Sequence, residues 1–183
     1  VGKNTLLITP EFGSYVFLGE LILDLDLPAD PPAEDGGASM HRSSSTGTCG
    51  KCHRCSDSCP THAFPAPYVL NSNLCISYLT IEHRGAIRED LRPLMRNWIY
   101  GCDECQSVCP WVRQYARPGA ARFLRLDPDL AAPRLSDLLS LDEDGFRTRF
   151  RGTPVLRAKR RGLLRNACIA LGNSGRAEAR PIL

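Results

Sequence analysis

The sequence lacks any long apolar run. No stretch approaches 18 uninterrupted apolar residues, and the longest candidate, 16–27, is broken by Gly19, Glu20, Asp24 and Asp26, so no membrane-spanning helix is expected. Apolar residues make up 43% of the 183 residues and charged residues 23%. This ordinary balance excludes wholesale disorder, collagen and coiled coil. The length predicts one domain or slightly more.

The chain also lacks an initiator methionine and a signal-peptide pattern. Its first residue is Val1, and its last residues, 179–183, follow closely on an apparent helix. We therefore expect both ends to be truncations and the chain to be a fragment of a longer protein.

Basic side chains are scarce at the start of the chain and abundant at its end. Residues 1–48 carry 2 basic and 7 acidic side chains, 49–110 carry 6 of each, and 111–183 carry 15 basic and 7 acidic. The total charge of +3 hides this gradient. A basic end on a nearly neutral chain indicates an anionic partner that is reached from one end.

The first part of the chain divides into two regions. Residues 1–28 contain short apolar runs at 5–8 and 15–23, which favour buried strands at the end of a compact α/β unit, although periodicity alone does not exclude a helix. Residues 29–48 are rich in proline, glycine and serine, and we expect a flexible linker or insertion there.

Residues 49–112 hold eight of the nine cysteines. The first run has the spacing of bacterial ferredoxins that carry [4Fe–4S] clusters, Cys49-x2-Cys52-x2-Cys55-x3-Cys59-Pro60. The second run repeats it without the leading cysteine, Cys102-x2-Cys105-x3-Cys109-Pro110, and Cys75 stands between the runs. In a run of this kind three thiolates bind one cluster, and the fourth binds the other.

The count of cysteines predicts two clusters with crossed ligands. Two clusters need eight thiolates, which is the number outside the C-terminal helix. The predicted ligands of the first cluster are Cys49, Cys52, Cys55 and Cys109, and those of the second are Cys59, Cys75, Cys102 and Cys105. The crossed fourth ligands would bring the clusters close enough for electron transfer.

Two other uses of cysteine compete with this prediction. All-cysteine zinc sites also contain CxxC pairs, although four cysteines at 2-2-3 spacing before a proline favour iron. A disulfide framework is disfavoured because loops this tight would strain many pairings. The ninth thiol, Cys168, lies among apolar residues and is interpreted as a buried core residue.

The C-terminal part holds a basic run. Residues 146–165 contain eight basic side chains and no acid. A helix is predicted over 154–171, with an apolar face and with Arg157, Arg161 and Arg165 recurring every four residues beside it. A row of guanidiniums suits the phosphates of a nucleic-acid backbone. A solvated charged face is the alternative, and the absence of acids argues against it.

Four further motifs carry a family resemblance. They are Gly2-Lys3-Asn4-Thr5-Leu6-Leu7-Ile8, Gly13-Ser14-Tyr15-Val16-Phe17-Leu18-Gly19-Glu20, Ser77-Tyr78-Leu79-Thr80-Ile81-Glu82-His83-Arg84-Gly85 and Asn97-Trp98-Ile99-Tyr100-Gly101-Cys102-Asp103-Glu104-Cys105-Gln106. Together with the cysteine runs, these motifs resemble the epoxyqueuosine reductase family over nearly the whole chain. That family depends on cobalamin and iron–sulfur clusters, and it reduces epoxyqueuosine to queuosine at the wobble position of tRNA.

The resemblance implies an α+β fold in three parts. Residues 1–28 would be the end of a corrinoid-binding α/β domain, and residues 49–112 a ferredoxin-like domain with two [4Fe–4S] clusters. Residues 113–183 would be a truncated, HEAT-like helical segment that grips tRNA. The family's partition of the cluster ligands agrees with the one given by the spacing.

The resemblance also implies roles for individual residues. Electrons would pass through the clusters to the cobalt, and the proton donor is expected upstream of Val1, so no catalytic residue is assigned and the fragment is expected to be inactive alone. The residues expected near the corrinoid are Tyr15, Gly19, Ile76, Cys102 and Asp103. Those expected near tRNA are His83, Arg84, Arg157, Arg160, Arg161 and Arg165.

The implied partners are tRNA and an external electron donor, for a monomer in the cytoplasm. Two alternatives are a plain two-cluster electron carrier and a corrinoid enzyme like the reductive dehalogenases, and the basic run argues against both. The sequence departs from the family in two places. The stretch 30–48 is longer and more polar than expected, and His62 stands where glycine is usual.

Overall fold

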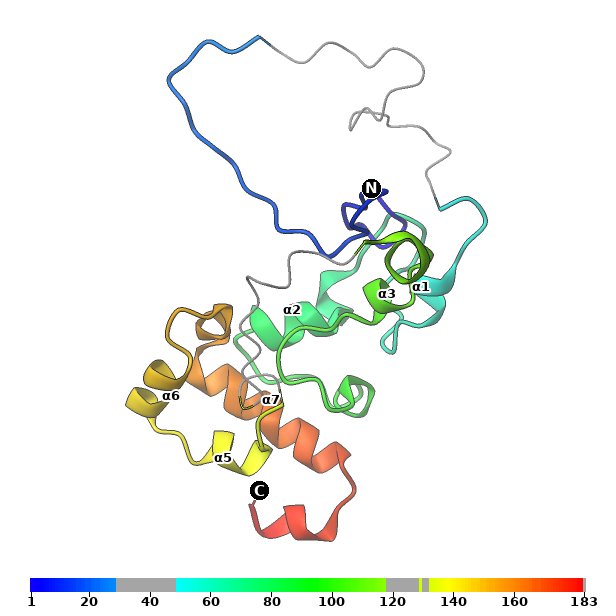
Figure 1. The fold of residues 1–183 in the computed structure, drawn as a ribbon. Coiled ribbons are helices and arrows are strands. Elements are labelled where there is room, and N and C mark those ends of the chain that lie inside the picture. The colour runs from blue at the N-terminus through cyan, green and yellow to red at the C-terminus, as the bar shows by residue number, and fades with distance from the viewer. Residues whose placement is uncertain (29–48, 118–128, 130–131, 183) are drawn as a thin grey trace.

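The computed structural model describes residues 1–28, 49–117, 129 and 132–182. These residues form short helices joined by loops (Figure 1). The α-helices are α1 (Arg54–Asp57), α2 (Ile76–Ile81), α3 (Glu104–Ser107), α5 (Leu135–Leu139), α6 (Glu143–Arg149) and α7 (Lys159–Asn173). The 3-10 helices are η1 (Ser72–Leu74), η2 (Pro93–Met95), η5 (Pro154–Ala158) and η6 (Ala177–Ile182), and η3 (Trp111–Tyr115) is a π-helix.

The two strands predicted near the N-terminus are not found, and that prediction is wrong for the described residues. Among the described residues near the N-terminus, the one β-bridge is the isolated pair Thr9 and Gly13. Residues 15–28 form an extended segment that leaves the body of the molecule (Figure 1). The side chains of Phe17 and Ile22 are fully exposed. A strand needs a neighbouring strand to receive its hydrogen bonds, and this segment has none within the described part of the chain. The expected linker, 29–48, lies outside the described residues.

Two apolar clusters hold the helical part together. The first gathers around α2 and consists of Ile76, Leu79, Ile87, Leu91 and Met95. The second joins α5, α6 and α7 and consists of Leu138, Phe146, Phe150, Leu163 and Ala167. Burial of such side chains is the main source of stability in a helical domain. The predicted apolar face of the C-terminal helix is confirmed, since Leu163, Ala167 and Ala170 are all buried.

A polar contact between α7 and α2 lies between these clusters. The Asn166 side chain is completely buried, and its amide donates to the carbonyls of Thr80 (2.8 Å) and Ile99 (2.9 Å). Its oxygen accepts from Nε and Nη2 of Arg165. Every hydrogen-bonding atom of the asparagine is thereby used, as a buried amide requires.

The predicted helix over 154–171 is present but divided. Thr153 and Pro154 begin η5, which ends at Ala158, and α7 then runs to Asn173. Lys159 separates the two because its φ is +61°, a left-handed conformation that a side chain disfavours. Arg157 and Arg161 therefore lie on different elements, and the single stripe of arginines is not formed. No helix in the described ranges is both long and apolar enough to span a bilayer.

Candidate functional site

The two cysteine runs fold into matching loops. Each loop wraps one short helix, so that Cys55 lies in α1 and Cys105 in α3, and the two helices pack together. The first loop turns tightly at Gly50, whose φ of +47° suits glycine. There the amide of Cys52 donates to the carbonyl of Cys49 (2.9 Å). The repeat seen in the sequence is thus a structural repeat as well.

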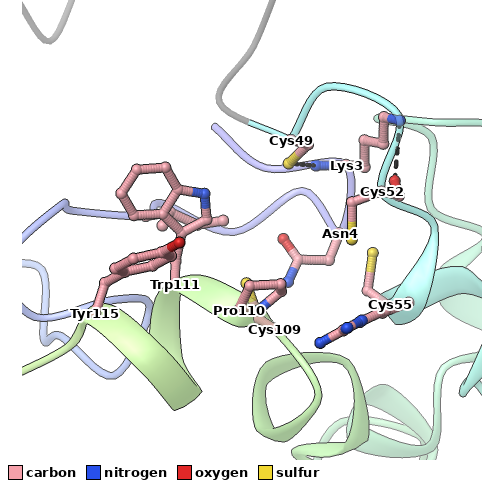
Figure 2. Close-up of a pocket in the computed structure, with 11 residues that line it drawn as sticks. Lys3, Asn4, Cys49, Cys52, Cys55, Cys109, Pro110, Trp111 and Tyr115 are labelled. Carbon is pink, nitrogen blue, oxygen red and sulfur yellow. Dashed lines mark hydrogen bonds between the residues drawn. The ribbon is translucent and has the colours of Figure 1, made fainter.

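The four thiols that the spacing assigns to the first cluster line one pocket. Its volume is about 230 Å³, and it lies between the first loop and the end of the second (Figure 2). Cys109, which belongs to the second run, lines it together with Cys49, Cys52 and Cys55. Trp111 and Tyr115 of η3 close one side, with ring centroids 5.3 Å apart. The spacing of the cysteines did not indicate these two aromatic residues.

The other four thiols influence one another electrostatically. Burial raises the pKa of the Cys102 thiol to about 11, and Cys75 and Cys59 add to the effect. Burial likewise raises the pKa of Cys105 to about 12, with further contributions from Cys102, Cys75, Cys55 and Cys59. The contribution of Cys55, from the first set, shows that the two sets of thiols are neighbours.

This donor set fits iron–sulfur clusters better than zinc. Four thiolates gathered in one partly buried place repel each other and need positive charge nearby, which cluster iron supplies. Zinc holds its four ligands around a single point, at about 2.3 Å for sulfur. Across the described ranges, no three cysteine, histidine or acidic side chains converge on a point where one ion could be held. A cubane instead takes each thiolate at a different corner, which suits separated thiols around a pocket.

The N-terminal segment closes over the cysteine loops. The ammonium of Lys3 donates to the carbonyls of Gly50 (2.7 Å) and Cys52 (3.0 Å), and its backbone amide points at Sγ of Cys49 (3.5 Å). Buried Asn4 donates to the carbonyl of Cys105 (3.2 Å). The cysteine pattern missed both residues, and the only signal for them was the motif Gly2-Lys3-Asn4-Thr5.

Two protein groups form hydrogen bonds with a sulfur of the second set. The amide of Ala63 lies 3.3 Å from Sγ of Cys59, and the hydroxyl of Thr61 lies 3.7 Å from it. Hydrogen bonds to cluster sulfurs are among the factors that set a reduction potential. Between these residues His62 adopts a φ of +50°, which explains why a glycine suits this position.

The residues expected near the corrinoid are only partly brought together. Tyr15 lies near Asp103, since burial raises the pKa of its phenol and the Asp103 carboxylate and Cys105 raise it further. Ile76 is buried in the first apolar cluster, and Cys102 packs against that cluster. Gly19 is on the extended segment, and apart from its chain neighbours no described residue has an atom within 4 Å of the position a Cβ would take.

The six residues expected near tRNA lie around the junction of α2, η5 and α7. The side chain of Arg157 pairs with the Glu82 carboxylate (2.5 Å), and Arg160 donates to the carbonyl of Leu141 (2.6 Å). Arg84 donates to the carbonyls of Ile81, Ala158 and Arg157. His83, Arg84, Arg161 and Arg165 line one pocket at this junction.

Arg165 has a structural role that the sequence did not reveal. Its Nη1 donates to the carbonyls of His83 (2.8 Å) and Gly85 (2.7 Å), and its Nη2 to that of Leu79 (2.6 Å). With its two bonds to Asn166, all five of its N–H donors are used. It contributes charge to this region but holds no spare donor.

The comparisons with known proteins agree with the site. Residues 48–112 match the model of the 4Fe-4S double cluster binding domain. The chain is 45% identical to epoxyqueuosine reductase of Pseudomonas aeruginosa over 174 residues, which are 95% of this chain and 45% of that protein.

Two solved structures agree as well. The epoxyqueuosine reductase of Bacillus subtilis superposes with a TM-score of 0.80 at 34% identity, covering 98% of this chain and 45% of that one. An epoxyqueuosine reductase solved with an epoxyqueuosine-modified tRNA-Tyr stem loop gives 0.81 at 34%, covering 99% and 44%. The chain thus spans less than half the length of the relatives it matches. The match extends over nearly all of this chain's own residues, so the chain resembles one part of an epoxyqueuosine reductase along almost its whole length.

Proposed function

We propose that this chain is the electron-transfer and RNA-contacting part of an enzyme that reduces epoxyqueuosine to queuosine in tRNA. The observation that carries the proposal is the gathering of eight thiols in two adjoining sets, in a chain 45% identical to an epoxyqueuosine reductase. The domain boundaries would be those proposed from the sequence: 1–28, 49–112 and 113–183, with the stretch 29–48 between.

The proposed ligands are the two crossed sets of thiols. Cys49, Cys52, Cys55 and Cys109 would hold one [4Fe–4S] cluster, and Cys59, Cys75, Cys102 and Cys105 the other. When bound, the clusters supply one-electron transfer. The chain's own residues fix the loops: Lys3 joins two carbonyls of the first loop, and Asn4 ties the N-terminal segment to the second. The crossing explains why two loops so distant in sequence stay packed together.

Cobalamin would lie against the face that carries Tyr15 and Asp103. Both belong to the region of the second set of thiols, and Tyr15 is about half exposed. Gln106 links the two segments that carry these residues. Its side-chain amide donates to the carboxylate of Asp103 (2.9 Å), and its side-chain oxygen accepts from the hydroxyl of Ser14, the residue before Tyr15 (3.0 Å). Bound cobalamin supplies a reactive cobalt centre for the epoxide. Ile76 and Cys102 would support this face from beneath, and Gly19 would approach from the extended segment.

tRNA is the proposed macromolecular partner. Residues 111–183 carry the excess of positive charge, and a relative was solved with a modified tRNA stem loop. The basic side chains around α2 and α7 lie in the part of the chain that also holds Cys75, which immediately precedes α2. The proposed RNA contact would then lie at the opposite end of α2 from a proposed cluster ligand.

The proposal is tested in cells that carry the whole gene encoding this chain. Replacing the genomic Cys75 by Ser should make their tRNA accumulate epoxyqueuosine in place of queuosine, as measured by mass spectrometry of digested tRNA. Cys168→Ser is the matched control, because Cys168 lies on α7 outside both sets. Normal queuosine in the Cys75→Ser strain would contradict the proposed function.

A further inference from the structure

The basic residues at the junction of α2 and α7 divide into two groups. Arg84, Arg157, Arg160 and Arg165 donate to backbone carbonyls or to a carboxylate within the protein. Lys159 and Arg161 are exposed, and within the described part of the chain their side chains make no hydrogen bond or ion pair. The first group builds the junction, and the second has its donors free for a ligand.

Both free cations line the same pocket. It has a volume of about 380 Å³, and its walls come from the segment 83–86 after α2 and from the start of α7. Besides Lys159 and Arg161, its charged walls are Arg84 and Arg165, and His83 adds an imidazole. No acidic side chain lines it among the described residues. The nearest acid in the sequence, Glu82, already pairs with Arg157.

The charges in this pocket repel one another. Burial lowers the pKa of Arg165, and the neighbouring charges of Arg84 and Arg161 lower it further. Three guanidiniums therefore lie within electrostatic range without a compensating carboxylate in the wall. Such an arrangement is unfavourable for the free protein and becomes favourable when an anion enters.

The start of α7 has the wrong charge for a helix N-terminus. The amide dipoles of a helix place partial positive charge there, so acidic residues are favoured in the first turn and basic ones are not. This 15-residue helix begins with Lys159, Arg160 and Arg161, has no acid in its first turn, and has no side-chain cap. Lys159 is in addition held at a φ of +61°. Strained backbone and unfavourable charge at one place are typical of a binding site.

We propose that this pocket binds one phosphodiester group of the RNA backbone, held by Lys159 and Arg161. Arg84 and Arg165, which are held in place by hydrogen bonds to backbone carbonyls, add positive charge. The exposed start of α7 adds its dipole, in the way that helix N-termini bind phosphate. This inference rests on the proposed function for the identity of the ligand as RNA. It differs from the arginine stripe expected from the sequence, because the contact is one pocket and its main donors include Lys159.

The pocket is separated from a proposed cluster ligand by the length of α2. Cys75 precedes the first residue of α2, and the pocket begins two residues after its last. Six helical residues span about 9 Å. A phosphate in the pocket would thus fix the RNA backbone at a short, constant distance from a proposed cluster ligand. Phosphate contacts of this kind set position and carry no sequence information.

The experiment compares two double variants of the reconstituted chain. Lys159→Gln with Arg161→Gln removes both free cations from the pocket. Arg151→Gln with Arg176→Gln is the matched control, since both arginines are exposed in the same basic region, lie outside the pocket and make no side-chain hydrogen bond or ion pair among the described residues. Iron content and far-ultraviolet circular dichroism establish that each variant is folded.

The first measurement is binding of a tRNA stem loop across a salt series. Each lost phosphate contact should lower the log–log slope by about 0.7 to 0.9, so the pocket variant, which loses one contact, should bind roughly 5- to 8-fold more weakly at 0.1 M salt. The control should change the slope by less than half as much. An equal change in both variants would overturn the pocket in favour of a diffuse basic surface.

The second measurement locates the phosphate. Stem loops in which one phosphate at a time is replaced by a neutral methylphosphonate are bound to both proteins. One position should weaken binding to the unaltered chain and have no further effect on the pocket variant. The absence of any such position would overturn the inference. A pocket effect together with normal queuosine in the Cys75→Ser strain would leave the phosphate site standing and refute the proposed function instead.

Discussion

The cysteine-rich end of this molecule, 49–60 and 102–109, and its helical end, formed by α2 and α5 to α7, are built on different principles. Around the cysteines, α1 and α3 have four residues each and bury no side chain completely. Around α2 and α7, two apolar clusters and the buried Asn166 hold long segments together. Isolated helices shorter than about 12 residues are marginal in water, so α1 and α3 cannot form without an external constraint. We infer that metal ligation stabilises the first end and side-chain burial the second.

The largest expected effect is on the cysteine-rich end when iron is removed. Anaerobic chelation should make the backbone amides of 49–60 and 102–109 exchange with solvent at the rate of an unfolded chain, because ligation there is also folding free energy. The amides of α7 should remain protected. Hydrogen exchange followed by mass spectrometry measures both. Equal loss of protection along the whole chain would show that the two ends are one cooperative unit.

The crossed ligands allow a sharper test by pairs of substitutions. Cys49→Ser with Cys109→Ser removes two ligands of the same proposed cluster, so about four irons should remain per chain out of about eight. Cys49→Ser with Cys59→Ser removes one ligand from each, and little iron should remain. Iron and sulfide analysis after anaerobic reconstitution distinguishes the two. If each run held its own cluster, the two results would be exchanged.

At the helical end, the buried amide is expected to matter most. Asn166→Ala should lower the free energy of unfolding by about 2–4 kcal/mol, because it leaves the carbonyls of Thr80 and Ile99 and part of Arg165 without partners. Asn173→Ala is the control: its amide also donates to two carbonyls, those of Arg92 and Arg96, but it is exposed to water. It should cost about 1 kcal/mol or less. Urea unfolding followed at 222 nm measures both, and equal effects would show that burial is not the cause.

The structural features that the sequence predicts are those set by local patterns, and those it does not predict depend on residues distant in the chain. Cysteine spacing is a local signal with a specific chemical meaning, and it grouped Cys109 with the first run, with which it lines a pocket. The helical periodicity likewise indicated the buried face of α7. The break at Lys159 was not visible, since the junction that holds it depends on Arg84, 75 residues earlier. The structural role of Arg165 could not be predicted either, because its guanidinium donates to carbonyls 80 or more residues away in the sequence. The strands predicted at 5–8 and 15–23 failed for a related reason: apolar runs indicate burial but do not supply the neighbouring strand.

The smallest expected effect concerns His62, at the cysteine-rich end. Its φ of +50° costs a residue with a side chain about 1 kcal/mol relative to glycine, although glycine loses more entropy on folding. Its imidazole is exposed and makes no hydrogen bond within the described residues. His62→Gly should therefore stabilise the reconstituted protein slightly, raising the temperature at which cluster absorbance is lost by about 1–3 °C.

His53→Gly is the matched control for that substitution, because His53 is also exposed and beside a cysteine but has a φ of −126°. With no strain to relieve, it should lower the same temperature slightly through the added entropy of glycine. A lower temperature for His62→Gly as well would show that the imidazole contributes to the cluster loop. In that case the cysteine-rich end would depend on side-chain packing around its metal and not on ligation alone, which would weaken the contrast with the helical end.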